Sequence, residues 1–140
     1  MPDMQQLPPL LGVFGLVCAF VIYLLLTRRP EGEGKVVKIA AAIHLGAMVF
    51  LQREYKMLAL FAAVLIALLW YFLGGNTALA FLCGAACSAL AGWLGMYAAT
   101  KANVRTTTAA HTQGAAAALS VAFYGGSIMG LCVASLGLLG

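Results

Sequence analysis

The chain of 140 residues is 64% hydrophobic and only 9% charged, whereas a soluble domain carries roughly 25% charged residues. These proportions exclude an ordinary soluble domain and predict an integral membrane protein. The formal net charge of +4 does not indicate nucleic-acid binding, because the few basic residues fall where membrane topology favours them.

Charged residues divide the chain into three uncharged apolar blocks, at residues 4–27, 57–100 and 106–140. A transmembrane helix needs about 20 apolar residues, so the blocks predict one, two and one membrane spans. The expected fold class is therefore all-α, with four transmembrane helices in a polytopic arrangement. The expected spans cover residues of about 10–26, 57–73, 78–100 and 115–139.

The first block begins around Pro8-Pro9, which suits a helix start because proline is tolerated in the first turn. The block ends at Thr27, and a short polar linker follows at residues 31–34. The N-terminus does not resemble a cleavable signal peptide. Its first six residues contain the acid Asp3 and no Lys or Arg, and the apolar run is too long.

The stretch from Lys35 to Leu73 predicts one continuous helix. No proline interrupts it, and Gly46 is its only interior glycine, at a cost of about 1 kcal/mol. About 39 residues at 1.5 Å each give a length near 58 Å, which exceeds a bilayer core of about 30 Å. We expect the basic, amphipathic half up to Lys56 to extend into the cytosol and the uncharged half to cross the bilayer.

The residues Gly74-Gly75-Asn76-Thr77 predict a turn by composition. The third helix is expected from Ala78 to Lys101 or a little beyond. A break at residues 111–114 is expected before a fourth helix at about Ala115–Leu139.

The basic residues predict the orientation, because all of them lie in two segments. Neither the turn at residues 74–77 nor either end of the chain contains one. By the positive-inside rule both segments are cytosolic, so the N-terminus and the end of the fourth helix face outside, most simply across the cell (inner) membrane. The two segments contain Arg28, Arg29, Lys35, Lys38, Arg53 and Lys56, and Lys101 and Arg105.

Small residues form an i, i+4 stripe on each of the last two helices. Because small residues let helix backbones approach closely in lipid, we expect both stripes to pack against other helices. A substrate groove along them is the less favoured alternative. The stripes are Ala80, Gly84, Ser88 and Gly92 on the third helix, and Ala122, Gly126, Gly130 and Ala134 on the fourth.

Few residues could support catalysis or ion transport. No acid, Lys, Arg or His lies inside the expected spans, although intramembrane ionisable residues usually mark ion pathways. The sequence contains no carboxylate pair for acid–base catalysis, no phosphate-binding loop and no metal cluster. We therefore predict no catalytic, cofactor-binding or metal-binding residue in the chain, whose four acids are Asp3, Glu31, Glu33 and Glu54.

Three groups of residues have both a functional and a plainer interpretation. Glu54 lies at the expected membrane boundary, where an ion pair with its basic neighbours or an interfacial anchor is favoured. His44 and His111 are expected in solvent or at the interface rather than as metal ligands. Cys83 and Cys87 share a helix face, but no His or acid is near in sequence, so apolar packing is favoured for all four cysteines, Cys18 and Cys132 included. Nothing in their placement implies an oxidising compartment.

Three segments together carry a family resemblance. Gly46–Lys56 (GAMVFLQREYK) resembles the GAMxFLxREYK segment of membrane-bound, ion-pumping inorganic pyrophosphatases. Gly95–Thr106 (GMYAATKANVRT) resembles the GMxxATxANVRT segment of that family, and Val121–Leu131 (VAFYGGSIMGL) is similar to its VAFxGGxxMGL helix. The segments occur in the family's order, and the resemblance covers roughly residues 34–140.

The resemblance implies that this chain is the N-terminal four-helix part of a larger pump. Family members have about sixteen transmembrane helices, each of the roughly 20 residues that a bilayer requires. They hydrolyse pyrophosphate on the cytosolic side, pump protons or sodium outward, and form homodimers. Mg²⁺ is held there by Asp-rich motifs such as DxxxDxxxDxxGK, and some members also use K⁺ or Na⁺. None of those motifs occurs here, so no site residue is carried over, and the four helices are expected to support an inner ring that does the chemistry.

One alternative remains open at this stage: a stand-alone four-helix membrane protein, such as a small exporter or an assembly factor. A proton-coupled exporter should carry an intramembrane Glu or Asp, and none is predicted here. The reading frame beyond Gly140 separates the two interpretations, because an open frame that encodes acidic DxxxD motifs favours the larger pump.

Overall fold

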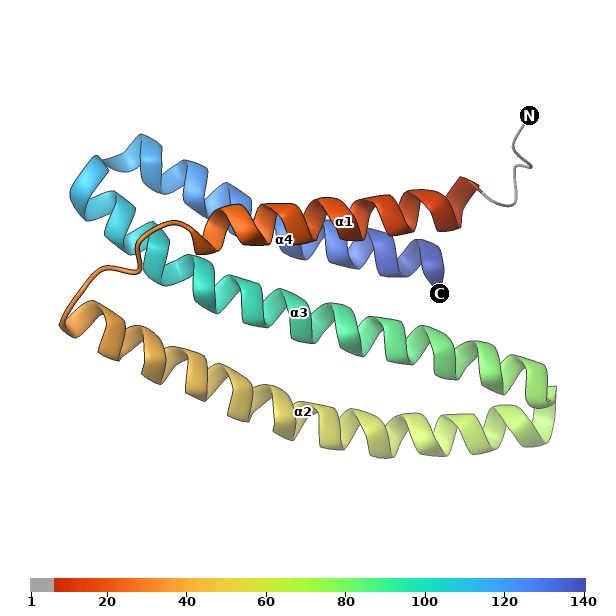
Figure 1. Ribbon diagram of the computed structural model, residues 1–140. Coiled ribbons are helices and arrows are strands. Elements are labelled where there is room, and N and C mark those ends of the chain that lie inside the picture. The colour runs from red at the N-terminus through yellow and green to blue at the C-terminus, as the bar shows by residue number, and fades with distance from the viewer. Residues whose placement is uncertain (1–6) are drawn as a thin grey trace.

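The computed structural model describes residues 7–140, which form four helices and no strand. All four helices are long and apolar enough to cross a membrane, so the all-α, four-helix prediction is confirmed. Asp3 and the rest of the N-terminal segment considered above lie outside the described residues. The helices are α1 (Leu7–Thr27), α2 (Lys35–Leu73), α3 (Gly75–Gln113) and α4 (Ala115–Leu139) (Figure 1).

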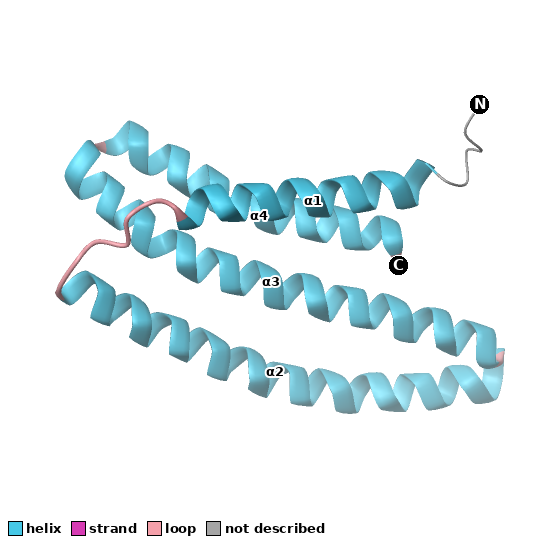
Figure 2. Cartoon of the chain, viewed as in Figure 1, coloured by secondary structure: helices cyan, strands magenta, loops and turns pink. Residues whose placement is uncertain are grey.

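The helices follow one another in space in the order α2, α3, α4, α1. Helix α3 packs against α2 on one side and α4 on the other, and α1 packs mainly against α4. Among the helices described, α2 packs against α3 alone. Figure 2 shows that only the connection between α1 and α2 is an extended loop, whereas the other two helix pairs join directly.

Single glycines separate the last three helices. Gly74 has φ 93° and ψ 166°, and Gly114 has φ 90° and ψ 179°. Only glycine adopts this region without strain, because any side chain would collide with the backbone. The turn expected at residues 74–77 is therefore too long: the break is Gly74 alone, and Asn76 and Thr77 belong to the first turn of α3.

Two helices match their expected ends closely and one starts earlier. Helix α2 is continuous from Lys35 to Leu73, and α4 runs from Ala115 to Leu139, as predicted. Helix α1 begins at Leu7 rather than at about residue 10, since prolines in a first turn need no backbone N–H partner.

Helix α3 is much longer than expected and continues to Gln113. The polar run after Lys101 was interpreted as a loop, but it contains no proline or glycine before Gly114. Its threonines donate to carbonyls one turn earlier, from Thr107 to Asn103 at 3.0 Å and from Thr112 to Thr108 at 2.8 Å, which satisfies their hydroxyls inside a helix. His111 therefore lies in the last turn of α3, not in a loop.

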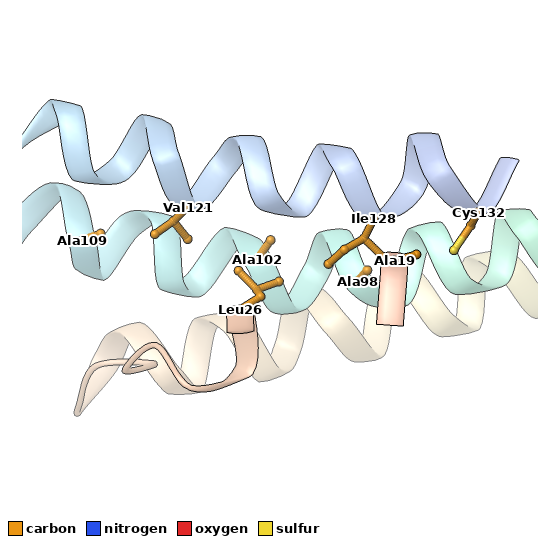
Figure 3. Close-up of a cluster of buried hydrophobic side chains, with 8 residues drawn as sticks. All are labelled: Ala19, Leu26, Ala98, Ala102, Ala109, Val121, Ile128 and Cys132. Carbon is orange, nitrogen blue, oxygen red and sulfur yellow. The ribbon is translucent and has the colours of Figure 1, made fainter. Parts of the chain in front are cut away.

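The core between α1, α3 and α4 consists mostly of small side chains (Figure 3). Because lipid offers no hydrophobic driving force for helix association, close backbone approach and van der Waals contact hold such helices together. Leu26, at the end of α1, is completely buried in this cluster. Its members are Ala19, Leu26, Ala98, Ala102, Ala109, Val121, Ile128 and Cys132.

The small-residue stripes do not make the contacts expected of them within these four helices. All four members of the α4 stripe are exposed, and a side chain added at Gly126 or Gly130 would meet no atom within 4 Å. The face of α4 that packs lies one residue away and includes Gly125, where an added Cβ would collide with Ala102. Of the two glycines in the α3 stripe, a Cβ added at Gly84 would meet no atom within 4 Å, whereas one added at Gly92 would meet Tyr55 of α2.

This difference between adjacent glycines gives the first prediction. Gly125→Leu should force α3 and α4 apart and lower the free energy of unfolding of the chain in detergent by about 1–3 kcal/mol. Gly126→Leu is the matched control: it should leave stability unchanged or raise it by up to about 1 kcal/mol, since glycine disfavours helix. Loss of helical circular dichroism during SDS titration measures both, and equal destabilisation by the two variants would contradict the observed packing face.

Candidate functional site

The most connected polar group in the structure is the guanidinium of Arg105 on α3. It is 5% exposed and is the only buried charge among residues 7–140. Its Nη2 lies 2.8 Å from Oε1 of Glu31, and its Nε donates to the carbonyl of Arg29 at 3.1 Å. The other donors reach the carbonyls of Lys101 at 2.8 Å and Thr27 at 3.4 Å.

This arrangement caps the C-terminal end of α1. The last carbonyls of a helix have no intrahelical partner and carry partial negative charge, so a cation there is favourable. From a different helix, Arg105 donates to one such carbonyl, that of Thr27, and to the carbonyl of Arg29 just beyond the helix, and its fork-shaped group can do this while pairing with Glu31. The cluster therefore ties the end of α1 and the start of the linker to one level of α3.

A second contact secures the same linker. The hydroxyl of Thr108 donates to the carbonyl of Glu31 at 2.9 Å. Gly32 has φ +85°, and a Cβ there would lie 2.5 Å from the Thr108 hydroxyl, so the linker approaches α3 too closely for a side chain. The linker expected to be only a polar spacer is thus held against α3 by both its backbone and Glu31.

His44 joins α2 to α3 through a polar contact. Its Nδ1 lies 2.7 Å from Oγ1 of Thr100, which is buried, and its ring meets the ring of Tyr97 edge-on with centroids 5.3 Å apart. The stacked partner of Tyr97 is Trp93, with centroids 5.6 Å apart. His44 is therefore a packing contact between two helices that includes a hydrogen bond, rather than a solvated side chain.

The segment Gly46–Lys56 of α2, which resembles a family motif, makes one specific contact with α3. The phenol of Tyr55 donates to the carbonyl of Ala89 at 2.5 Å. A Cβ at Gly92 would lie 2.8 Å from that hydroxyl, so the contact depends on a glycine one turn later. This explains one member of the α3 stripe, as the place where a tyrosine reaches the backbone of its neighbour.

An apolar groove of about 720 Å³ lies between the membrane-facing parts of α2 and α3. Ser88 and Gly92 of the α3 stripe line it, together with Leu58, Phe61 and other apolar side chains. Its lining includes no charged residue, so it offers nothing to bind a charged substrate.

Among residues 7–140, no three His, Cys, Asp or Glu side chains come together as metal ligands would. All four cysteines are free thiols: Cys83 is exposed, Cys18 and Cys87 are partly buried, and Cys132 is buried in the core. Glu54 forms no ion pair with Arg53 or Lys56, because the one ion pair in the described part of the chain joins Arg105 to Glu31. The ion-pair interpretation of Glu54 is therefore wrong within these helices.

From the sequence, Arg105 served only as a marker of topology and Glu31 as one acid of a polar linker, so their contact was not predicted. The residues are 74 positions apart, and no local pattern pairs them. A signal was present, however. Arg105 is followed by three threonines and preceded by Ala98 and Ala102 at helical spacing, which would have aligned it with a buried face of a longer α3.

Comparison with known protein families gives one match, to the model described as inorganic H+ pyrophosphatase, over residues 13–140. A K(+)-stimulated pyrophosphate-energized sodium pump of Thermotoga maritima is 46% identical over 114 residues, which are 81% of this chain and 16% of that protein. K(+)-insensitive pyrophosphate-energized proton pumps of Moorella thermoacetica and Methanosarcina mazei are 43% and 40% identical, over 92% and 94% of this chain. The chain spans only 19% and 20% of those two proteins.

The Arg105 cluster gives the second prediction. Arg105→Gln should lower the free energy of unfolding by about 1–3 kcal/mol, because the carbonyls of Thr27 and Arg29 lose their donors and Glu31 loses its ion-pair partner. Glu31 is 39% exposed and can be rehydrated, which keeps the loss below that of a fully buried pair. Arg28→Gln, at an exposed site, should change stability by less than about 0.5 kcal/mol.

Two measurements check this prediction: SDS-induced unfolding, and the rate at which proteinase K cleaves the connection between α1 and α2 at residues 28–34. Arg105→Lys should resemble Arg105→Gln, since an ammonium cannot reproduce the planar fork. Wild-type cleavage and stability in Arg105→Gln would show that the cluster does not hold the linker.

Proposed function

Since this chain belongs to the inorganic H+ pyrophosphatase family, we propose that it is the N-terminal four-helix part of a membrane pump that couples pyrophosphate hydrolysis to outward ion translocation. The observation that carries the proposal is the family match, which covers residues 13–140 and therefore all four helices. The chain is an integral membrane protein with four helices that can span a bilayer. The parent protein, meaning the full-length pump, would supply the remaining four-fifths of the sequence.

Within that pump we assign these helices a supporting role around the helices that do the chemistry. In the described residues, polar groups serve contacts between helices: Arg105 and Thr108 hold the linker, His44 meets Thr100, and Tyr55 meets Ala89. Phosphoryl transfer needs cations and carboxylates arranged around the phosphates. The polar groups named above instead make contacts between helices or with the linker.

The resemblance implies Mg²⁺ for the whole pump, and the described residues do not fit this ion. Mg²⁺ needs oxygen ligands arranged octahedrally, with one or two carboxylates beside the substrate phosphates. Glu31 is engaged by Arg105, Glu33 follows it in the same connection and Glu54 lies on α2, and no three potential metal ligands come together among residues 7–140. We therefore propose that Mg²⁺, and any K⁺ or Na⁺ requirement, involves parts of the parent protein outside this chain.

The partners proposed for the parent protein are pyrophosphate, the lipid bilayer, and either H⁺ or Na⁺ as the transported ion. Relatives of both kinds match: the Thermotoga maritima protein is named a sodium pump and the Moorella thermoacetica protein a proton pump. A homodimer in the cell (inner) membrane, with the N-terminus outside, completes the proposal.

The third prediction concerns activity. The parent protein in inside-out vesicles should release phosphate from pyrophosphate in the presence of Mg²⁺ and accumulate H⁺ or Na⁺ in the lumen. Residues 1–140 alone should do neither, because the described residues hold no cluster of metal-binding carboxylates. Phosphate release by the purified 1–140 chain would contradict the supporting role. If the parent protein released no phosphate from pyrophosphate, the proposed pump function would be contradicted.

The fourth prediction concerns orientation. In a protein whose natural cysteines are replaced, Thr77→Cys should react with an impermeant maleimide only from outside the cell. Thr112→Cys, at the other end of the same helix, should react only from the cytosolic side, in keeping with the basic residues near it. Both positions are exposed, so accessibility within these helices does not bias the comparison. Labelling of Thr77→Cys from the cytosolic side would reverse the proposed topology.

A further inference from the structure

Charged side chains of residues 7–140 mark two levels along α3, and only one of these levels can lie at the cytosolic membrane surface. The first level is that of Arg105, which contacts carbonyls of Thr27 and Arg29 at the end of α1. The second is that of Tyr55, whose phenol bonds the carbonyl of Ala89 and whose neighbours are Arg53, Glu54 and Lys56. We call these last three residues the α2 charge cluster.

The separation of the two levels follows from the number of residues between them along α3. From Ala89 to Arg105 are 16 residues, or about 24 Å at 1.5 Å per residue. From Gly75, at the turn, to Ala89 are 14 residues, or about 21 Å. The α2 charge cluster thus lies near the middle of the hairpin formed by α2 and α3, and Figure 1 shows the turn of this hairpin extending beyond the end of α4.

Helix α1 identifies which level is the membrane surface. Its 21 residues carry no charge and measure about 31 Å, the thickness of a bilayer core. The helix ends at the level of Arg105, and the exposed residues Arg28 and Arg29 follow at once. A core that starts at this level contains α1 completely.

The other choice of surface fails on length. If the cytosolic boundary lay at Lys56, about 26 Å of α2 and about 21 Å of α3 would remain before the turn, both less than a bilayer core of about 30 Å. Large apolar side chains of α2 would also stand in water between Lys38 and Arg53. These exposed side chains are Ile39, Ile43, Leu45, Val49 and Phe50.

The hairpin fits the membrane when the boundary lies at Arg105. From Arg105 to Gly75 are 30 residues, or about 45 Å, so the hairpin crosses a core of about 30 Å that starts at the Arg105 level and extends about 15 Å beyond it. Trp70 and Tyr71, both exposed, then reach the outer headgroup region, where such side chains are enriched. This boundary places the large exposed apolar side chains of α2 in lipid. It also places the α2 charge cluster well inside the bilayer, whereas Lys101 lies only one turn from the Arg105 level.

We propose that the α2 charge cluster lies inside the bilayer, rather than at the boundary expected from the sequence, and is the docking point for another transmembrane segment of the parent protein. This inference rests on the proposed function, because it takes the chain to be part of a longer pump. The partner segment presents a carboxylate to Arg53 and Lys56 and lies along the free side of α2.

Charge and packing both favour a protein segment as the occupant. The cluster has two cations and one anion, its side chains are exposed, and none has an ion-pair partner within residues 7–140. Lipid tails offer no counter-charge at this depth, and charged groups there pair with one another or face a protein interior. Helix α2 has a free side, since it packs against α3 alone, and the pumps it resembles are about five times longer than this chain.

The depth of the α2 charge cluster in the membrane is tested with an impermeant maleimide. The reagent is added to the full-length, cysteine-replaced protein in inside-out vesicles. Lys38→Cys, at the cytosolic level, should react at least about tenfold faster than Lys56→Cys, because the reagent does not enter the hydrocarbon core. Similar rates at the two positions would place the cluster in water and overturn the proposal.

The occupant is tested by a photo-crosslinking benzoylphenylalanine at position 53 of the full-length protein, with the adducts identified by mass spectrometry. We expect an adduct with a peptide of the same polypeptide beyond residue 140 that contains an Asp or Glu. The matched control is the same probe at Tyr71, which is 81% exposed at the hairpin end and should give lipid adducts. A lipid adduct at position 53, or an adduct with a second copy, would overturn the assigned occupant.

The failure of this proposal can be distinguished from the failure of the proposed function. Pyrophosphate-driven ion uptake by the unmodified full-length protein tests the pump by itself. A protein that pumps but labels rapidly at Lys56→Cys, or gives only lipid adducts at position 53, retains the function and refutes the docking point. A protein that does not pump refutes the function, whereas the labelling and crosslinking results still report the depth and the neighbour of the cluster.

Discussion

The structure depends on one buried cation and the carbonyls that it caps. A helix that ends inside a membrane protein leaves carbonyls without partners, and each one buried away from water is costly. Arg105 donates to the carbonyl of Thr27, the last residue of α1, and to that of Arg29 just beyond it, and it also pairs with Glu31. Because α1 packs mainly against α4, and α4 against α3, this single anchor closes the arrangement of three helices and sets their relative heights.

The core that surrounds this anchor is made of alanine and other small residues, and this choice has a consequence for the surface. In lipid the large apolar side chains gain nothing from burial against another helix, so they can point outward, as Phe14, Phe61 and Phe123 do. The exposed stripe of small residues on α4 is then unusual, since it offers neither bulk to lipid nor a contact within these helices. Such a surface suits a further helix of a larger assembly, in keeping with the supporting role proposed here.

The hairpin of α2 and α3 shows how membrane thickness constrains interpretation as strongly as contacts do. On the insertion scale an Arg, Lys or Asp at the centre of a membrane helix costs roughly 2.5–3.5 kcal/mol, although neighbouring groups can reduce this. A chain that keeps Arg53, Glu54 and Lys56 together at the middle of an apolar hairpin bears that cost unless another polar segment shares it. The same residues lie in Gly46–Lys56, one of the three segments that resemble the pump family. Under the proposal above, their cost in the bilayer is met by assembly with another segment, so their role is in assembly rather than in catalysis.

The sequence by itself determined the fold class, the number of helices and the continuous α2, because uncharged length, proline placement and charge distribution act locally and survive any packing. It also carried the family resemblance, through three short segments in order. Only the tertiary structure decided that α3 runs to Gln113, that Gly125 rather than Gly126 faces α3, and that His44 meets Thr100. These outcomes depend on the rotation and height of each helix against its neighbours. A one-residue rotation separates the packed face of α4 from its exposed stripe, and the contact of Arg105 with Glu31, across 74 positions, sets heights that no local pattern encodes.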